Sequence, residues 1–143
     1  MSIKENPSDI QIEQIPYYLS WQIRKIVFDP NPIDYKIDDD ENGVHFGLYI
    51  GKNLIGVVSW FIEKDGAEFK KLGILNEFQG KGFGKMLLTH CIDYFKSQGI
   101  KTFRCESNKN SIGFYENLGF KKTNPTEAFH CYACIAMELS IKV

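Results

Sequence analysis

The sequence predicts a single α/β domain over residues 1–143, in which a mixed, mostly antiparallel central sheet is flanked by helices. Three observations support this fold class. Several short apolar segments end at glycine, asparagine or proline, as strands do. Longer segments carry apolar residues at helical spacing. The expected order is strand, helix, three strands, helix, strand, helix, strand, which is typical of helices packed on one sheet.

The N-terminal part of the chain is expected to hold one strand and one helix. Residues 10–15 suit a strand, and residues 15–28 suit an amphipathic helix with Pro16 in its first turn. Prolines after residue 28 end that helix. The acidic run from Asp38 to Glu41 is expected to be a solvated loop, and attraction of a cationic acceptor is the alternative. The apolar bulk of the helix is expected from four residues, namely Tyr18, Trp21, Ile26 and Phe28.

The remaining elements follow from alternation, helical spacing and turn residues. We expect Gly99 to end the longer helix and Gly119 to end the shorter one in the left-handed conformation. Asn108 or Asn110 is expected to cap the shorter helix. The expected strands cover residues 45–50, 54–63, 67–75, 101–106 and 129–139, and the expected helices run from within the glycine-rich loop to about 98 and from 111 to 118.

The strand expected at residues 67–75 leads into a glycine-rich loop and then a helix. Gly80, Gly82 and Gly84 fall within five residues. Because glycine lacks a Cβ atom, the backbone there can approach a ligand closely and accept positive φ. The helix that begins inside the loop directs unpaired N–H groups forward, which suits a phosphate or pyrophosphate. The spacing fits neither a Walker loop nor the dinucleotide-binding fingerprint, and a turn that merely starts a helix stays open as an alternative.

Composition and charge exclude several classes of function. The formal net charge is −1, which argues against general binding to nucleic acid, since such binding needs clustered basic residues. No apolar run approaches the roughly 20 residues of a membrane span, and the first residues resemble no secretory signal. We therefore expect a cytoplasmic protein with reduced cysteines. Cys131 and Cys134 are interpreted as small core residues, and no metal is expected because no second pair completes four ligands.

Two motifs carry a resemblance to a known family. The pattern Gln79-x-x-Gly82-x-Gly84 resembles the acetyl-CoA signature of the GNAT superfamily of N-acetyltransferases. A second stretch resembles that family's motif Asn-x-x-Ala-x-x-Phe-Tyr-x-x-x-Gly-Phe, with Ser111 in place of the usual alanine. The resemblance covers residues 45–121 well and the ends more loosely. The matching positions of the second motif are Asn108, Phe114, Tyr115, Gly119 and Phe120.

The resemblance implies the acyl-CoA acyltransferase fold of this family, in a small single-domain member of bacterial type. It implies an acetyl-CoA-dependent enzyme that transfers an acetyl group to a primary amine by direct attack on the thioester. The acceptor would be a small molecule or a peptide, and a homodimer stays open. The main alternative is a non-catalytic CoA-binding or regulatory domain on the same scaffold, because a fold does not fix an activity. A nucleotide-binding module is a third hypothesis.

The resemblance also implies roles for individual residues. Tyr115 would protonate the departing thiolate, and a backbone N–H at Gly73 or Ile74 would face the developing oxyanion. Lys70 stands where a bacterial subgroup has a strand glutamate. Glu106 is expected to end the strand next to the cofactor gap and is therefore ranked first as the general base, ahead of Glu68 and His130. Arg24 and His130 are expected to contact the acceptor. Residues expected to bind the cofactor are Leu72, Gly73, Ile74, Leu75, Gln79, Gly80, Lys81, Gly82, Phe83, Gly84, Lys85, Asn108, Ser111, Phe114 and Tyr115.

Overall fold

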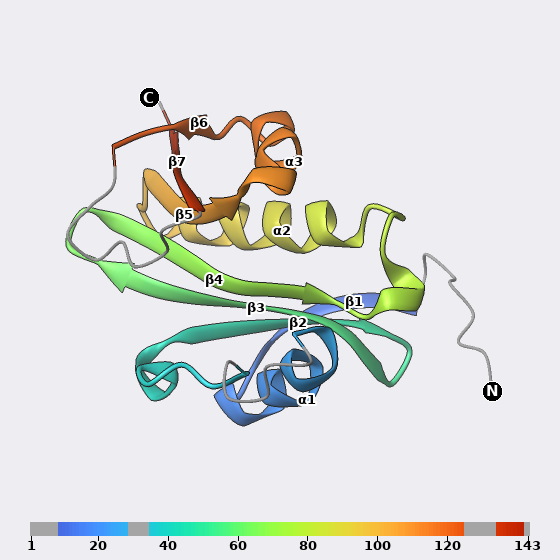
Figure 1. The fold of residues 1–143 in the computed structure, drawn as a ribbon. Helices are drawn as coiled ribbons and strands as arrows, with labels where there is room; N and C mark the ends of the chain where they lie inside the picture. Colours follow the sequence, from blue (N-terminus) through green and yellow to red (C-terminus); the bar gives the residue numbers. More distant parts are fainter. Residues whose placement is uncertain (1–8, 29–34, 125–133, 142–143) are drawn as a thin grey trace.

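The computed structural model describes residues 9–28, 35–124 and 134–141. Seven strands form one sheet in the order β1-β2-β3-β4-β5-β7-β6. Helix α1 covers one face of this sheet, and α2 and α3 lie on the other side (Figure 1). All strand pairs are antiparallel except β4 with β5, which confirms the expected mixed, mostly antiparallel sheet flanked by helices.

The helices and strands lie close to where the sequence predicts them. The strands are β1 Ile10–Ile15, β2 Val44–Ile50, β3 Asn53–Glu63, β4 Gly66–Ile74, β5 Thr102–Asn108, β6 Lys121–Lys122 and β7 Cys134–Ser140. The α-helices are α1 Tyr17–Val27, α2 Phe83–Ser97 and α3 Ile112–Asn117, and three 3-10 turns are η3 Asp40–Asn42, η4 Asn76–Phe78 and η5 Lys109–Ser111. Strand β6 and the turns η3 and η4 were not predicted. The expected start of the last strand, residues 129–133, lies outside the described residues.

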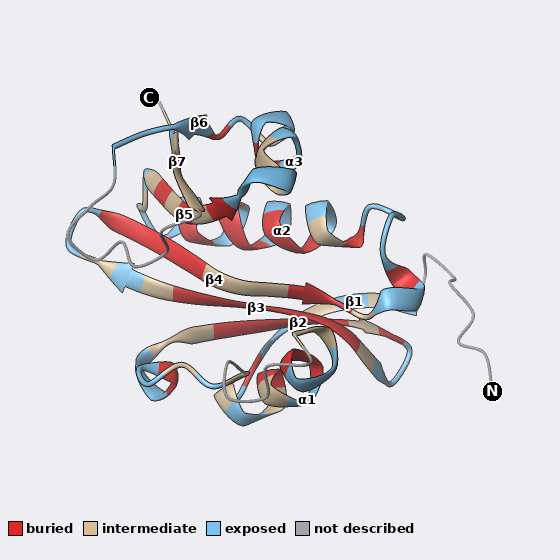
Figure 2. Cartoon of the chain, in the orientation of Figure 1, coloured by how far each residue is buried: buried red, intermediate tan, exposed pale blue. Residues whose placement is uncertain are grey.

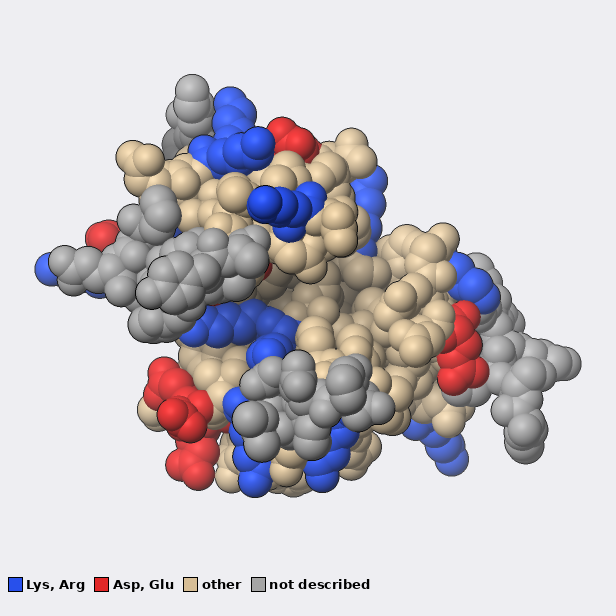
Figure 3. Space-filling model, in the orientation of Figure 1, with Lys and Arg blue, Asp and Glu red and all other residues tan. Residues whose placement is uncertain are grey.

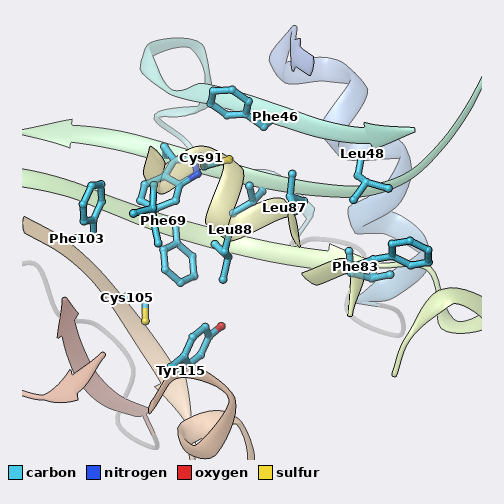
Figure 4. Packing of buried hydrophobic residues seen from close by; sticks show 14 of the residues in the cluster. Phe46, Leu48, Phe69, Phe83, Leu87, Leu88, Cys91, Phe103, Cys105 and Tyr115 are labelled. Carbon is cyan, nitrogen blue, oxygen red and sulfur yellow. The ribbon is translucent and has the colours of Figure 1, made fainter. Parts of the chain in front are cut away.

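The main core forms where α2 packs on the sheet. Helix α2 buries six side chains at helical spacing, namely Phe83, Leu87, Leu88, Cys91, Ile92 and Phe95. The ring of Phe95 lies 5.1 Å from that of the fully buried Trp60 on β3. Buried residues run along the central strands and the sheet-facing side of α2 (Figures 2 and 4). This continuous apolar contact stabilises the placement of both ends of α2 relative to β4.

Helix α1 departs from its expected amphipathic pattern. Tyr18 and Ile26 are 55% and 57% exposed, so the prediction that they supply apolar bulk is wrong. The helix instead buries Arg24 completely. The Arg24 guanidinium donates two bonds to the Asp40 carboxylate, at 2.8 and 3.0 Å, and one to Ser59 Oγ on β3 at 2.6 Å. Asp40 is itself buried, so the expectation that the whole acidic run is solvated is also wrong.

Strands β4 and β5 pair over a very short length. Only two residue pairs connect them, Ala67 with Phe103 and Glu68 with Arg104. Beyond Glu68, β4 contains an irregularity in its register with β3. At this point Lys71 has φ 55, the one positive φ of a non-glycine residue in the described part of the chain. A bulge increases local twist and bends its strand, and the edge of β4 that faces β5 is left open.

The cysteines of the described segments fall into two groups. Cys91 and Cys105 are free and buried, as small core residues would be. Cys134 is disulfide-bonded, so the prediction of a reduced thiol is wrong at this position. Cys131 lies outside the described residues. Among the described residues, no helix combines the length and apolarity that crossing a membrane requires, and no group of His, Cys, Asp or Glu side chains is placed to hold a metal ion.

Candidate functional site

The glycine-rich loop adopts the backbone that its sequence predicts. Gly80 and Gly82 have φ 76 and φ 87, in the left-handed region where side chains are strained. A Cβ atom added at either position would meet no atom within 4 Å, so no described residue covers this turn. The loop therefore presents bare backbone to the surface at the start of α2.

The N-terminus of α2 is available to an anion. Its first helical hydrogen bond runs from Met86 N to Gly82 O, so the N–H groups of residues 83–85 have no intrahelical acceptor. The Gln79 side chain braces the approach to this helix by donating to Ile74 O at 2.8 Å and to Asn76 Oδ1 at 3.1 Å. Unpaired amides and the helix dipole together favour a phosphate group at this position.

A groove of about 470 Å³ extends along this loop between β4 and α3. Most of the residues expected to bind a cofactor line it. Four of them, Gly73, Leu75, Lys81 and Asn108, do not, whereas Val27 and Phe78 do and were missed by the sequence analysis. The expected residues that line the groove are Leu72, Ile74, Gln79, Gly80, Gly82, Phe83, Gly84, Lys85, Ser111, Phe114 and Tyr115.

The ladder between β3 and β4 decides which backbone amide faces this groove. Leu75 N donates to Ile55 O, so Leu75 belongs to a hydrogen-bonded pair. Pairs alternate along an antiparallel ladder. Gly73, opposite Val57, therefore directs its N–H toward β3, whereas Ile74 directs its N–H toward the open edge. Of the two amides considered from the sequence, only that of Ile74 can face a ligand between β4 and β5.

Tyr115 is held in place from both ends of α3. Asn108 Oδ1 accepts hydrogen bonds from Asn110 N and Ser111 N at 3.0 Å each, so Asn108 caps the turn η5 that leads into α3, whereas α3 itself has Ser111 as its N-cap with no side-chain cap bond. At the other end Gly119 has φ 97, and Phe120 N donates to Tyr115 O at 3.0 Å. The Tyr115 ring packs 5.7 Å from the Phe69 ring (Figure 4). Burial raises the pKa of its hydroxyl, so Tyr115 keeps its proton at neutral pH.

A second pocket, of about 450 Å³, lies on the other side of Tyr115. Leu72, Ser111 and Tyr115 line both this pocket and the groove, so the two cavities meet at these three residues. Unlike the groove, the second pocket is rich in charge. Its walls include Glu68, Glu106, Lys70, Lys71, Asn108, Phe28, Phe69 and Cys134.

Glu68 is the unusual carboxyl of this pocket. It is 7% exposed, and burial raises its pKa from 4.5 to about 7. A hydrogen bond with Glu63 and the negative charges of Glu63 and Glu106 act in the same direction, whereas the Lys70 charge opposes them. A carboxyl with a pKa near neutrality can exchange protons at physiological pH, and such groups are concentrated at functional sites.

The sequence predicted that Arg24 and His130 would contact the acceptor. Arg24 is fully buried beneath Asp40 and Ser59, so its guanidinium offers no surface to a substrate, and the structure corrects that expectation. His130 lies outside the described residues. The sequence analysis missed Phe28 and Lys71 as pocket residues. The bulge that brings Lys71 to the pocket carries no glycine to signal it, so sequence pattern alone had no means of finding it.

Comparison with known proteins adds independent information. A family model described as Acetyltransferase (GNAT) family matches residues 10–120. An uncharacterised N-acetyltransferase of Bacillus cereus is 30% identical over 101 residues, and the match covers 64% of this chain and 61% of the relative. A ribosomal-protein alanine N-acetyltransferase of Salmonella typhimurium is 27% identical over 125 residues, which cover 85% of this chain and 78% of that protein.

Solved structures agree with these sequence matches. The PaiA N-acetyltransferase of Thermoplasma acidophilum, solved in complex with coenzyme A, superimposes with a TM-score of 0.71. That match has 19% sequence identity and covers 92% of this chain and 98% of the other. At such identity the similarity shows the fold alone. The family match, by contrast, spans most of the chain and includes the glycine loop and all of α3. This chain therefore belongs to the GNAT family of acetyltransferases.

Proposed function

We propose that this protein is an N-acetyltransferase that uses acetyl-CoA and transfers the acetyl group to a primary amine by direct attack on the thioester. One observation carries the proposal. The groove along the glycine loop and the charged pocket meet at Tyr115, whose hydroxyl stays protonated because burial raises its pKa. A donor thioester and an acceptor amine in these two cavities would therefore meet beside a proton donor.

The residues of the groove fit coenzyme A, which supplies an acetyl group activated as a thioester. The amides of residues 80–85 would hold the pyrophosphate, with Lys85 on the groove wall adding positive charge. The open edge of β4 would pair with the amide groups of the pantetheine arm in the manner of an added strand. The Ile74 N–H, directed to that edge, would donate to the thioester carbonyl oxygen as negative charge develops there.

The acceptor nitrogen must lose a proton to react. An alkyl amine has a pKa near 10.4 and is charged at pH 7, so a base within reach assists the attack. Glu68 suits this role, because its buried carboxyl has a pKa of about 7; Glu106 lines the same pocket and is the alternative. Glu68 takes one proton from the ammonium group and passes it to water. The neutral nitrogen then forms a bond to the acyl carbon, the carbon–sulfur bond breaks, and the nitrogen releases its second proton to water as the amide forms.

The leaving sulfur receives its proton from Tyr115. A free thiol, with a pKa near 8.5, is a stronger acid than a tyrosine hydroxyl, so Tyr115 donates a hydrogen bond to the sulfur and yields its proton only as the carbon–sulfur bond breaks. Tyr115 then regains its proton from water. Named relatives support an amine acceptor, since one acts on the alanine of a ribosomal protein and another is a peptidyl-lysine N-acetyltransferase.

The proposal is tested by Tyr115→Phe, which removes only the hydroxyl. We expect kcat to fall by about a hundredfold or more, as for loss of a general acid, while coenzyme A still raises the melting temperature as in the wild type. Tyr94→Phe is the matched control, because Tyr94 lies on the exposed side of α2 away from both cavities. Acetylated products are detected by mass spectrometry from a mixed amine library. Tight binding of coenzyme A with no product from any amine would instead support a non-catalytic CoA-binding domain.

A further inference from the structure

The charged pocket, which would hold the acceptor amine, contains two lysines that the proposed chemistry does not use. Lys70 and Lys71 are adjacent in β4, and both line the pocket together with Glu68 and Glu106. Like charge near the acceptor nitrogen lowers its pKa, but it also opposes binding of the amine as a cation, so two ammonium groups beside the nitrogen itself would weaken acceptor binding. Their place in this pocket therefore calls for a different explanation. Lys or Arg side chains also border the hollow that opens between the upper and lower parts of the molecule (Figure 3).

The bulge in β4 is what brings both lysines to one side. Arg24 of α1 donates to Ser59, so Ser59 and its partner Lys70 lie on the face covered by α1. Regular alternation would turn Lys71 to the opposite face. Instead the Lys71 ammonium lies 4.9 Å from the centre of the Phe28 ring, at the C-terminal end of α1. The extra residue of the bulge thus places two consecutive lysines at the same pocket.

Lys71 occupies this position although its backbone conformation is unfavourable for a residue with a side chain. A left-handed conformation destabilises a residue with a Cβ atom by about 1–2 kcal/mol, and glycine would adopt φ 55 without strain. Strained residues are concentrated where a side chain takes part in function. A lysine at the strained position, beside a cavity, indicates that its side chain interacts with a ligand there.

The negative and positive groups of the pocket wall lie at different depths. Glu68 and Lys70 lie two residues apart on one strand face, with Lys70 Nζ 3.9 Å from Glu68 Oε1. Glu68 is nearly buried, whereas the Lys70 side chain is 37% exposed. The pocket therefore presents a carboxyl group in its depth and ammonium groups nearer its opening. A ligand that matches this arrangement carries an amine, which faces the deep carboxyl group, and a negative charge a few bonds away, which faces the ammonium groups.

We infer that the acceptor is a small amine that also bears an anionic group, recognised by Lys70 and Lys71 while its nitrogen faces Glu68. This inference rests on the proposed acetyl transfer and names the acceptor class of the same site. A carboxylate and a phosphate share the required chemistry. The pocket volume of about 450 Å³ accommodates a molecule of amino-acid size.

The test compares acceptors that differ only in the anionic group. With acetyl-CoA and the full chain, kcat/KM is measured for a set of amino acids, for their carboxamides, and for the amines that lack the carboxylate carbon. A parallel arm compares 2-aminoethyl phosphate with ethylamine. We expect at least one anionic acceptor to exceed its neutral counterparts by about tenfold or more, as a hydrogen bond to a charged group provides. The arm in which this occurs identifies the anion as carboxylate or phosphate.

Variants then assign the preference to the lysines. Lys70→Met and Lys71→Met are each expected to reduce the ratio of kcat/KM for the anionic acceptor to kcat/KM for its neutral counterpart, measured with the same variant, by about tenfold, mainly through KM for the anionic acceptor. Lys70→Arg should retain much of the preference. Lys52→Met is the matched control, because Lys52 lies in the exposed β2–β3 turn outside the pocket.

The outcomes separate this inference from the function on which it rests. Equal or better transfer to the neutral amines, or a preference that survives in both methionine variants, would overturn the anionic-acceptor inference and leave acetyl transfer standing. Absence of any acetylated product, with coenzyme A bound, would overturn both. Loss of transfer to every acceptor in the methionine variants would also overturn it, since the lysines would then serve the reaction rather than recognition of the anion.

Discussion

Replacement of Glu68 by glutamine tests the electrostatics of the site most directly. Glutamine keeps the shape of the buried side chain and can still hydrogen-bond Glu63, but it cannot ionise. In the wild type, burial raises the pKa of Glu68 from 4.5 to about 7. Between pH 4.5 and about 7, the wild-type Glu68 is protonated in the folded chain and ionised in the unfolded chain. The glutamine variant has no such difference in proton binding.

The sign of the effect follows from proton linkage. Below pH 4.5 the carboxyl is neutral in the folded and the unfolded chain, so glutamine and glutamic acid should be nearly equivalent. As pH rises toward 7, the unfolded chain loses the proton first, and the free energy of unfolding of the wild type falls. At 1.36 kcal/mol per pKa unit, the loss above pH 7 is about 3 kcal/mol, which corresponds to roughly 10 °C in melting temperature for a domain of this size.

The measurement is thermal unfolding of both proteins at pH 4.5 and pH 8. Glu68→Gln should melt within a few degrees of the wild type at pH 4.5 and roughly 10 °C higher at pH 8. Buried His45 and Asp40 also have shifted pKa values, but they are common to both proteins and cancel in the difference. Glu13→Gln, at an exposed position of β1, serves as the control and should show no such dependence on pH.

The same variant tests the role of Glu68 as base. Wild-type kcat/KM should fall as pH drops through about 7, because the carboxyl becomes protonated. In the glutamine variant the residual activity should lack this acid limb. A melting-temperature difference that is equal at both pH values would refute the raised pKa, and an acid limb that persists in the variant would assign the base elsewhere, with Glu106 the first candidate.

Three further substitutions test the backbone and the buried ion pair. Lys71→Gly relieves the left-handed strain and should raise the free energy of unfolding by about 1 kcal/mol in urea titrations, while transfer to the anionic acceptor declines; a destabilised glycine variant would contradict the strain. Gly82→Ala meets no atom within 4 Å but must hold φ 87, so unfolding should become easier by about 1–2 kcal/mol, and the stabilisation of the protein by coenzyme A should weaken because the new methyl group lies on the bare loop. Arg24→Met leaves the Asp40 carboxylate buried without its main partner and should destabilise the protein by about 3–5 kcal/mol; the double variant with Asp40→Leu should recover much of this, and failure to do so would show that the pair is not the source of the loss.

The parts of the site that the sequence predicted are those encoded by contiguous residues. The glycines at 80 and 82 had to adopt positive φ for the chain to turn into α2, and their spacing alone indicates this. Asn108 capping the turn before α3 and Gly119 ending that helix are equally local features. Each depends on backbone geometry within a few residues, so a sequence pattern carries enough information to identify it.

The errors arise where contacts join residues distant in the sequence. Arg24 looked like an interruption of an apolar helix face, because its partners Asp40 and Ser59 are 16 and 35 residues away. A guanidinium is buried without a large loss of stability only when such partners accept its hydrogen bonds. The spacing of apolar residues along the helix gives no information about these distant partners. The raised pKa of Glu68 has the same origin, since Glu63 and Glu106 reach it from neighbouring strands.

Strand β4 connects the two cavities because its regular structure is broken at one residue. Before the bulge, Glu68 still pairs with β5 and is buried between strands, which is the condition for its raised pKa. After the bulge, the pairing with β5 has ended, and Ile74 directs its N–H to a free edge. Lys71, at the break itself, lies beside the pocket on the side of α1. The proposed base, anion contact and carbonyl contact thus come from one strand that changes register once, because unbroken alternation would turn the Lys71 side chain to the face opposite Glu68.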